Sequence, residues 1–281
     1  MLSYRHAFHA GNHADVLKHC LLVAMLRYMN HKDKPWWYVD THAGAGIYDL
    51  DAGHAQKTAE YRSGIERLWS RDDLPELLAD YVALVRDLNP DGRLRLYPGS
   101  PWLASRIMRP GDQLRLFELH STDTQMLRHV FAELSHHIKT EATDGFLGLK
   151  AVLPPQPRRG LVLIDPSYEI KDDYRRVIAA MKESLERFAT GTYAVWYPML
   201  QRMESRDLPD KLKRLPVKSW LHVSLTVQTP SPEGFGMHGS GLFIVNPPWQ
   251  LADQMKTLMP WLVTVLGQDD GATYRLEQQA D

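Results

Sequence analysis

The chain has 281 residues, with 33 Lys and Arg against 34 Asp and Glu, so its formal net charge is −1 at pH 7. That balance excludes a protein that coats nucleic acid through bulk positive charge, but it allows contact with a short stretch of nucleic acid. Hydrophobic residues make up 44% of the chain, which suits about two globular domains, or one large α/β domain with an insertion.

Cysteine usage and the lengths of the apolar runs bear on the compartment. Cys20 is the single cysteine, so an intramolecular disulfide is excluded and a reducing compartment is expected. The first residues contain no apolar segment of the signal-peptide type. The longest uncharged run near the N-terminus, residues 20–26, is far shorter than the roughly 20 residues of a membrane span. We therefore expect a cytoplasmic protein without a membrane partner.

The predicted elements alternate between helices and strands. Asn12 and Asp15 resemble a capping box before an amphipathic helix that ends near Asn30. Runs typical of strands lie at residues 36–40, 114–118, 138–142, 160–165, 193–198, 221–228 and 241–245. Further helical patterns lie at residues 58–71, 74–88, 102–108, 126–134, 172–188, 199–215 and 251–266.

This order of elements predicts the fold class. Strands that alternate with helices form right-handed βαβ units and a mostly parallel sheet. The last two predicted strands have no helix between them, so we expect them to pair antiparallel. The prediction is an α/β, Rossmann-like fold with a seven-stranded, mostly parallel sheet and an antiparallel last pair. This arrangement resembles the class I S-adenosylmethionine methyltransferase fold.

A turn with Gly44 and Gly46 follows the first predicted strand. Such glycines allow the backbone to approach a ligand closely, although a plain strand-to-helix turn is the alternative. A dinucleotide fingerprint is excluded because Asp49 occupies the place of its third glycine. A P-loop is excluded because no Gly-Lys-[Ser/Thr] sequence follows a glycine-rich loop.

Glu118 and the pair Asp144-Gly145 each follow a predicted strand, at the edge where an open α/β sheet binds ligands. A carboxylate after the second strand can accept hydrogen bonds from both ribose hydroxyls of a nucleoside. An Asp after the third strand can accept one from an adenine amino group. A solvated strand end and an ordinary Asx turn are the respective alternatives.

The spacing of these motifs predicts the domain organisation. Glu118 lies 72 positions after Gly46, whereas about 20 are usual between such a turn and its acid. We therefore predict that residues 49–95 form an inserted helical subdomain. Residues 1–48 and 96–281 then form the main domain.

Asp165-Pro166-Ser167-Tyr168 follows the fourth predicted strand and resembles the [Asp/Asn/Ser]-Pro-Pro-[Tyr/Phe/Trp] motif of methyltransferases that act on nucleotide amino groups. The N6 lone pair of adenine is delocalised into the ring, so a carboxylate and a main-chain carbonyl that accept both N6–H bonds make it a better nucleophile. A carboxyl pKa of about 3.9 is too low for outright deprotonation, so Asp165 accepts the proton only as the nitrogen becomes cationic. Tyr168 is expected to stack on the flipped base.

Residues 246–249, Asn-Pro-Pro-Trp, are a second and more literal copy of this motif. They follow the last predicted strand, which we place at the edge of the sheet, whereas Asp165 follows a central strand beside the crevice. We therefore assign the chemistry to Asp165 and interpret residues 246–249 as a turn before the final helix.

Histidines are concentrated near the N-terminus, where His6 and His19 accompany Lys18. Their irregular spacing disfavours a metal site, so no metal is predicted. A polar cap, or a segment that folds over the crevice and contacts substrate and cofactor, are the other two interpretations.

The segments MLSYRHAFHAGNHADVLKH, DTHAGAG, YPGSP, FELH, DGF, LIDPSYE, WYP and NPPW occur in this order over essentially the whole chain. Together they closely resemble the bacterial large-subunit rRNA adenine-N6 methyltransferase J family. The resemblance implies S-adenosylmethionine-dependent N6-methylation of adenine 2030 in 23S rRNA, either protein-free or in an early assembly intermediate. It also implies a class I fold with a small helical insertion.

The motifs and the resemblance together imply a set of site residues. The implied cofactor contacts are His19, His42, Gly44, Gly46, Ser100, Glu118, Asp144, Gly145 and Asp165. The implied substrate contacts are Tyr4, His6, Lys18 and Tyr168, and the implied catalytic residues are Asp165, Pro166 and Tyr168. Ser167 stands where the family usually has Pro, so we expect looser positioning or slower transfer rather than lost activity.

Two other functions stay open. A DNA adenine-N6 methyltransferase is disfavoured because residues 49–95 are short and not basic for a target-recognition domain. A non-catalytic RNA-binding protein with a methyltransferase fold is disfavoured because the glycines and acids of the crevice are all present. We expect a monomer without an obligatory protein partner.

Overall fold

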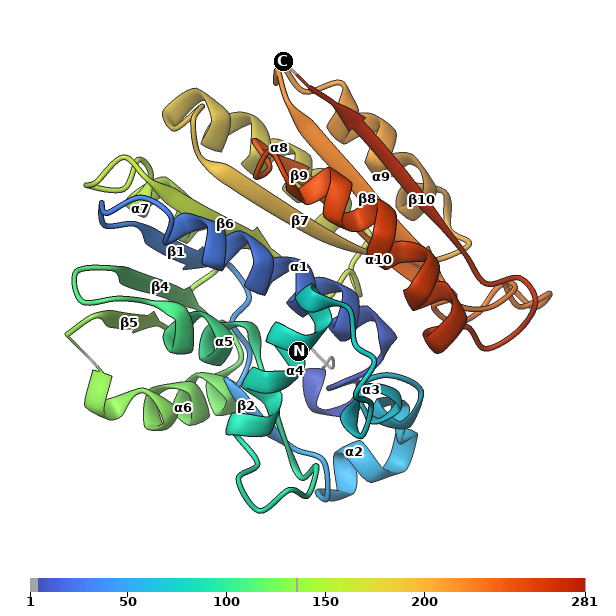
Figure 1. Cartoon of the computed structure of the whole chain (residues 1–281). Helices are drawn as coiled ribbons and strands as arrows, with labels where there is room; N and C mark the ends of the chain where they lie inside the picture. The colour runs from blue at the N-terminus through green and yellow to red at the C-terminus, as the bar shows by residue number, and fades with distance from the viewer. Residues whose placement is uncertain (1–4, 135, 281) are drawn as a thin grey trace.

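A mixed eight-stranded sheet forms the centre of the molecule, in the strand order β10-β8-β9-β7-β6-β1-β4-β5 (Figure 1). The computed structural model describes residues 5–134 and 136–280. The strands are β1 (Trp37–Asp40), β4 (Gln113–Phe117), β5 (Ile138–Glu141), β6 (Gly160–Ile164), β7 (Thr192–Met199), β8 (Trp220–Thr226), β9 (Gly239–Val245) and β10 (Thr273–Gln279).

Strand direction decides which loops share an edge of the sheet. The pairs β7–β6, β6–β1, β1–β4 and β4–β5 are parallel. β9 is antiparallel to both β7 and β8, so β8 runs in the same direction as β7. The segments that follow β1, β4, β5, β6, β7 and β8 therefore meet at one edge, which we call the carboxyl edge.

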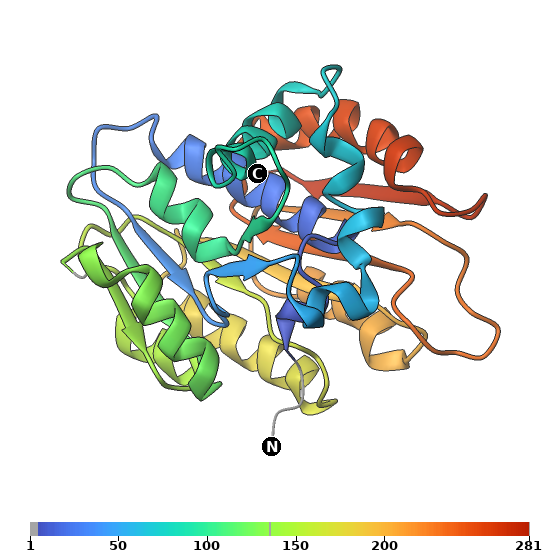
Figure 2. The same ribbon diagram turned by 90° about the horizontal axis from the view of Figure 1, so that it is seen from below.

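Helices cover both faces of the sheet, and Figure 2 shows the resulting three layers. Side chains alternate along each strand, so Leu161 and Leu163 join one hydrophobic cluster while Val162 and Ile164 join the other. The first face carries α1 (His13–Met29), α5 (Ser100–Ile107) and α10 (Leu251–Leu266). The second carries α7 (Gly145–Val152), α8 (Asp172–Arg187) and α9 (Met203–Lys213). α6 (Ser121–Val130) follows β4.

Asn12 caps α1 as the sequence predicts. Its Oδ1 accepts hydrogen bonds from the backbone N–H groups of Ala14 and Asp15, both at 3.0 Å. Asp15 does not complete a capping box with Asn12, because its carboxylate accepts instead from the N–H of Gly11 at 2.9 Å. The predicted end of the helix near Asn30 is confirmed.

The segment between β2 (Ile47–Asp49) and β3 (Leu96–Pro98) is helical, and these two strands pair antiparallel at its ends. It contains α2 (Gly53–Thr58), α3 (Glu66–Trp69) and α4 (Glu76–Asp87), with a short 3-10 turn at Glu60–Ser63 between α2 and α3. Two other 3-10 turns, at His6–Phe8 and Ala132–Leu134, lie outside this segment. Its side chains share one hydrophobic cluster with α1. The assignment of residues 49–95 as an inserted subdomain stays a prediction.

One predicted helix in this segment is wrong. Residues 58–71 do not form a single helix, because Ala59 adopts a left-handed φ of +49° and ends α2. Gly64 then separates the following 3-10 turn from α3, and a Cβ at Gly64 would lie 2.1 Å from the carbonyl oxygen of Gly11. The chain therefore breaks where it must pass close to the start of α1.

The predicted seven strands are corrected to eight in the main sheet. The additional strand, β10, pairs antiparallel with β8 and forms the outer edge, so β9 is an interior strand. Its sequence, TYRLEQQ, is mostly polar and its side chains are mainly exposed. It therefore lacks the apolar run by which the buried strands are recognised.

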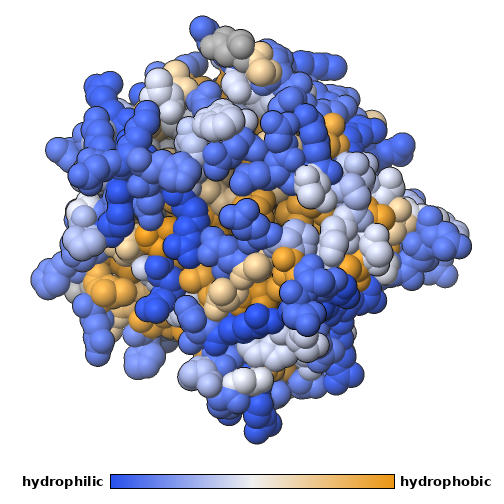
Figure 3. All heavy atoms as spheres, viewed as in Figure 1, coloured by the Kyte–Doolittle hydropathy of each residue, from blue (hydrophilic) through white to orange (hydrophobic). Residues whose placement is uncertain are grey.

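The surface in Figure 3 is hydrophilic over most of the face that carries α1 and α10, with hydrophobic residues gathered across its middle. Trp69, Trp261, Leu74 and Leu77 are half-buried side chains that pack on the cluster beneath. No helix within the described residues is long and apolar enough to cross a membrane.

Candidate active site

A cavity of about 780 Å³ opens at the carboxyl edge of the sheet, a size typical of small-molecule sites. The predicted residues that line it are His6, Lys18, His19, His42, Gly44, Ser100, Glu118, Asp144, Gly145, Asp165 and Pro166. Gly46 and Tyr168 are not among its lining residues. Tyr4 lies outside the described residues.

The turn after β1 is fixed by Glu118 at the end of β4. The N–H of Gly44 donates to Glu118 Oε2 at 2.8 Å, and the N–H of His120 donates to Oε1 at 2.7 Å. Gly44 has a φ of +63°, and a Cβ there would lie 2.1 Å from the hydroxyl of Tyr48. Burial raises the pKa of Glu118. This arrangement places a carboxylate against the cavity, where it can accept hydrogen bonds from hydroxyl groups.

Gly46 shapes the turn without reaching the cavity. Its φ is +83°, and its carbonyl accepts from the N–H of Gly99 at 2.8 Å. Gly46 therefore lies outside the lining of the cavity, and its contact with a cofactor stays a prediction.

Asp144 caps α7 and faces the cavity. Its Oδ1 accepts from the N–H groups of Phe146 at 2.9 Å and Leu147 at 3.4 Å, and its Oδ2 pairs with Arg176. Burial would raise the pKa of this carboxyl, but the hydrogen bond and charge of Arg176 outweigh it and lower the pKa. A Cβ at Gly145 would lie 1.9 Å from the carbonyl oxygen of Thr41, so the close approach of α7 to β1 requires glycine.

Asp40, at the end of β1, lies beneath the cavity and is fully buried. Its Oδ2 accepts from the hydroxyls of Tyr38 and Ser100, each at 2.7 Å, and its Oδ1 accepts from the N–H of His42 at 3.2 Å. Burial raises the pKa of Asp40 to about 6 and lowers that of His42 to about 4. These hydrogen bonds hold Ser100 and His42 at the cavity wall.

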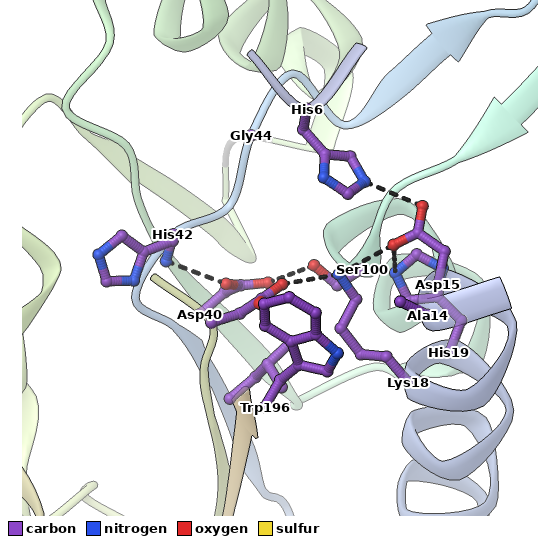
Figure 4. A network of polar contacts seen from close by, with 12 residues as sticks. His6, Ala14, Asp15, Lys18, His19, Asp40, His42, Gly44, Ser100 and Trp196 are labelled. Carbon is purple, nitrogen blue, oxygen red and sulfur yellow. Dashed lines mark hydrogen bonds and ion pairs between the residues drawn. The ribbon is translucent and has the colours of Figure 1, made fainter. Parts of the chain in front are cut away.

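A chain of charged groups crosses the cavity from α1 to the end of β6 (Figure 4). Lys18 Nζ lies 2.7 Å from Asp165 Oδ2 and 3.0 Å from Asp15 Oδ1. Asp15 Oδ2 in turn lies 2.9 Å from His6 Nε2. Lys18 thus joins the N-terminal segment to a residue 147 positions away in the sequence.

Burial and charge act in opposite directions on these groups. Burial disfavours the charged form of Lys18, but the carboxylates of Asp15 and Asp165 outweigh it and raise the Lys18 pKa. Burial would likewise raise the pKa of Asp15, yet His6 and Lys18 hold it well below its ordinary value. For Asp165 burial dominates, so its pKa is raised although Lys18 opposes the shift.

His19 lies one position after Lys18, and its ring is buried at the inner wall of the cavity. Its Nδ1 lies 2.8 Å from the hydroxyl of Tyr97, whose ring stacks on it with centroids 5.6 Å apart. Burial lowers the His19 pKa to about 3, so this imidazole is neutral at pH 7.

Tyr168 is not placed to stack on a base. It is 1% exposed, its hydroxyl donates to the carbonyl oxygen of Trp196 at 2.6 Å, and its ring packs on Tyr174. Its φ of +54° is that of left-handed backbone. The expectation of stacking by Tyr168 is therefore not met, because its ring belongs to the hydrophobic core.

Trp196 presents the aromatic face at this wall instead. The ring lines the cavity beside Lys18, whose Nζ lies 5.5 Å from the ring centroid (Figure 4). Its indole Nε1 is buried and has no hydrogen-bond partner among the described residues. No role is predicted for Trp196 from the sequence, although a signal is present there, because an aromatic residue stands near the end of the strand beside Asp165.

Asn246 and the residues after it lie far from the cavity. β9 runs antiparallel to β7, so its end lies at the edge opposite to the carboxyl edge. There, Asn246 Nδ2 donates to the carbonyl oxygens of Ala189 and Gly191 at 2.9 and 2.7 Å. The prediction that residues 246–249 follow an edge strand is wrong, since β9 is an interior strand. The antiparallel direction of β9 is what separates these residues from the cavity.

No candidate metal site is present in the part of the chain that the structure describes. No group of three His, Cys, Asp or Glu side chains is arranged there to hold an ion.

Comparison with known proteins gives concordant results. The family model described as "Ribosomal RNA large subunit methyltransferase D, RlmJ" matches residues 33–277. The chain belongs to the ribosomal RNA large subunit methyltransferase J family. It is 48% identical over 262 residues to the Escherichia coli K12 protein named ribosomal RNA large subunit methyltransferase J, covering 93% of each chain.

Two further relatives match this chain over almost its whole length. The Haemophilus influenzae protein of the same name is 44% identical over 278 residues, covering 99% of this chain and 98% of that protein. The crystal structure of protein LPL1258 from Legionella pneumophila matches with a TM-score of 0.88 at 37% identity, covering 97% of this chain and 99% of that one. The α/β fold of the family is therefore shown over essentially the full chain.

The methyl donor of this methyltransferase family is S-adenosylmethionine. The cavity has the features that such a donor requires. The Gly44 turn and the tight Gly145 contact bring backbone to its wall, and the carboxylates of Glu118 and Asp144 face it from the ends of β4 and β5. These two carboxylates can therefore accept hydrogen bonds from ribose hydroxyls and from an amino group.

Asp15 is a polar group of the site whose role the sequence left undefined. It is 1% exposed and bonds to Gly11, His6 and Lys18. Its spacing in the sequence could have indicated this role, because Asp15 precedes Lys18 and His19 by three and four residues and so shares their helix face.

Proposed function

We propose that this protein transfers a methyl group from S-adenosylmethionine to N6 of one adenine in 23S rRNA, the adenine that corresponds to position 2030. The observation that carries the proposal is the position of Asp165, which projects from the end of β6 into the cavity beside the Gly44 turn. The names of the relatives support RNA as the substrate. The substrate is the RNA itself or an early assembly intermediate, in the cytoplasm, and the enzyme acts as a monomer.

In the proposed complex, S-adenosylmethionine supplies an activated methyl group. Glu118 accepts hydrogen bonds from its ribose, and Asp144 accepts one from its adenine amino group. Gly44 and Gly145 allow the backbone to approach it, and His19, His42 and Ser100 complete that wall. All of these lining residues face one cavity.

Asp165 and the main-chain carbonyl of Pro166 accept the two N6–H bonds of the target adenine. With S-adenosylmethionine bound, the new C–N bond would form as the methyl–sulfur bond breaks, and S-adenosylhomocysteine would leave. Asp165 would accept the proton that the methylated, cationic nitrogen loses. Burial raises the pKa of Asp165, which makes the carboxylate a better proton acceptor near neutral pH than an exposed Asp.

Trp196 takes the stacking role that the sequence assigned to Tyr168. Stacking on an aromatic side chain is worth about 1–3 kcal/mol per base, which offsets the cost of unstacking the adenine from the RNA. Tyr168 supports Trp196 from below through the hydrogen bond to its carbonyl oxygen. Lys18 gives up part of its contact with Asp165 when N6 binds and keeps its contact with Asp15, since both carboxylates lie within 3.0 Å of its Nζ.

The decisive test is methyl transfer by the wild-type protein and by Asp165→Asn, a substitution of the same shape. We expect N6-methyladenosine in a 23S rRNA transcript and none in DNA. Asp165→Asn should lower kcat roughly 10²–10⁴-fold, because it removes the proton acceptor. Its affinity for S-adenosylmethionine, measured by calorimetry, should change less than about threefold, or about 0.65 kcal/mol.

Asn246→Gly is the matched control for the rival motif, because glycine tolerates the φ of +52° at this position. It should retain the wild-type rate constant. Loss of transfer in Asn246→Gly with retention in Asp165→Asn would refute the assignment. Methylation of DNA, or RNA binding without any transfer, would establish one of the two alternative functions.

A further inference from the structure

The cavity extends beyond the position of the target base. In the sheet, β9 and then β8 follow β7, and adjacent strands lie about 4.8 Å apart. The loop 227–238, which joins β8 to β9, therefore lies at the carboxyl edge, and the N–H of His238 donates to the carbonyl oxygen of Met199 at the end of β7 at 3.2 Å. Its residues Gln228 and Met237 line the same cavity as Asp165, as does Gln268 before β10.

The opposite wall of this extension comes from the start of α1 and from the helical segment after β2. His13 and Glu60 line it. The carboxylate of Glu60 is engaged, with His9 Nδ1 at 2.8 Å and Asn12 Nδ2 at 2.9 Å. Burial lowers the His13 pKa to about 4, so its imidazole is neutral at pH 7.

The hydrogen-bonding groups here suit a nucleobase better than a phosphate. His13 Nδ1 is buried and has no hydrogen-bond partner within the described residues. Gln228 and Gln268 carry amide groups, which match the mixed donors and acceptors of a base edge. Gln228 Nε2 donates to the carbonyl oxygen of Met237 at 3.4 Å, and its amide oxygen is the acceptor that it offers. A phosphate site would instead show unpaired Lys or Arg side chains, and none line this part of the cavity among the described residues.

An exposed aromatic residue is adjacent in sequence to the cavity lining. Phe235, in the same loop, is 79% exposed and lies between Gly234 and Gly236, whose φ values are +79° and +86°. Gly236 itself lines the cavity. An exposed aromatic ring is a stacking surface for an unstacked base.

We infer that His13, Gln228, Met237 and Gln268, with the exposed Phe235 next to the lining residue Gly236, form a site for the RNA nucleotide adjacent to the target adenine. We call it the flanking-nucleotide site. This inference rests on the proposed function and explains how the enzyme would select an adenine within RNA. The helical segment after β2 then contributes a wall to the substrate site through Glu60 and Ser63.

The test compares adenosine monophosphate with a trinucleotide that has adenosine in the middle, as methyl acceptors for the full-length protein. Phe235→Ala and Gln268→Ala are the variants, because neither side chain packs in the hydrophobic core. Gln254→Ala is the matched control, since Gln254 lines a separate hollow near Arg27 and Asp80.

We expect wild-type kcat/KM to be higher for the trinucleotide than for the mononucleotide. Phe235→Ala should reduce the trinucleotide value about tenfold, the scale of one lost stacking contact. Gln268→Ala should reduce it about fivefold, the scale of one lost hydrogen bond. Their values for adenosine monophosphate, and all values of Gln254→Ala, should stay within about twofold of wild type, or about 0.4 kcal/mol.

Equal losses on both acceptors, or no loss on either, would overturn the flanking-nucleotide site. Failure of the wild-type protein to methylate any RNA would instead overturn the proposed function. The affinity of a fluorescent trinucleotide for the Asp165→Asn variant distinguishes these two failures, because it measures binding to the flanking-nucleotide site without methyl transfer. In that background, Phe235→Ala should weaken binding about tenfold, and unchanged affinity would refute the inference.

Discussion

Asp40 and Asp165 end neighbouring strands of the sheet, yet their surroundings give them different roles. Asp40 is fully buried and has neutral hydrogen-bond donors, the hydroxyls of Tyr38 and Ser100. Asp165 reaches the cavity and has a cation as its partner, Lys18. Burial raises both pKa values. A neutral environment suits a structural carboxyl, whereas a movable cation beside an accessible carboxylate suits one that must exchange partners.

The raised pKa of Asp40 predicts a pH-dependent stability. Raising a carboxyl pKa from 3.8 to about 6 corresponds to about 3 kcal/mol. Because the folded pKa is higher than the unfolded one, this contribution is fully present below pH 3.8 and is lost as pH rises through about 6. Asp40→Asn should remove that part of the pH dependence, and urea unfolding between pH 4 and pH 8 measures it. Identical pH profiles of the two proteins would contradict the prediction.

Among the elements, the helix starts depend on local sequence while strand directions do not. The Asn12 cap of α1 and the Asp144 cap of α7 each satisfy N–H groups two and three residues further along. The direction of β9 is set instead by its pairing with β7 and β8. That pairing sends residues 246–249 to the edge opposite the cavity, and no local motif specifies it.

The cap of α7 predicts a stability difference between two substitutions of one residue. Asp144→Ala removes the acceptor for Phe146 and Leu147 and should lower the free energy of unfolding by about 1 kcal/mol. Asp144→Asn keeps a capping oxygen and should lose only a few tenths of a kcal/mol. The ion pair with Arg176 adds little, because its side chains are 34% and 24% exposed. Urea unfolding at pH 7 measures both, and equal losses would show that the ion pair matters more than the cap.

For the whole molecule, a net charge of −1 conceals a pairing of charges across the surface. The basic run that begins at Lys211 is partly neutralised, since Lys211 pairs with Asp207 at 3.7 Å and Lys213 with Glu277 at 2.8 Å. The cavity itself carries both signs, with Lys18 and Arg176 among its carboxylates. Such a surface suits recognition of one base and its neighbour rather than a long backbone.

This distribution predicts weak salt dependence of RNA binding. With about three phosphate contacts, the slope of log K against log salt should be between about −2 and −3. Fluorescence anisotropy with a short RNA between 50 and 200 mM KCl measures it. A slope of about −6 or steeper would show that the protein contacts an extended backbone.

Local sequence patterns were sufficient to predict most helix starts and strand ends, and with them much of the cavity wall. Strands that end at Asp40, Glu118 and Asp165 could be recognised because a short apolar run followed by Gly, Pro or an acid is a local signal. Their common edge follows from the βαβ order. Residues 58–71 were mispredicted because Ala59 turns left-handed only under the contacts of the folded chain.

Which of these residues lie together could be learned only from the folded chain. It joined Lys18 to Asp165, buried Tyr168 while it brought Trp196 to the cavity, and added β10 as the outer strand. The physical reason is the sequence separation of the interacting residues, because helix caps and strand ends depend on neighbours only a few residues away. Side-chain burial and antiparallel pairing depend on the total contacts of segments far apart in the chain, which no local pattern encodes.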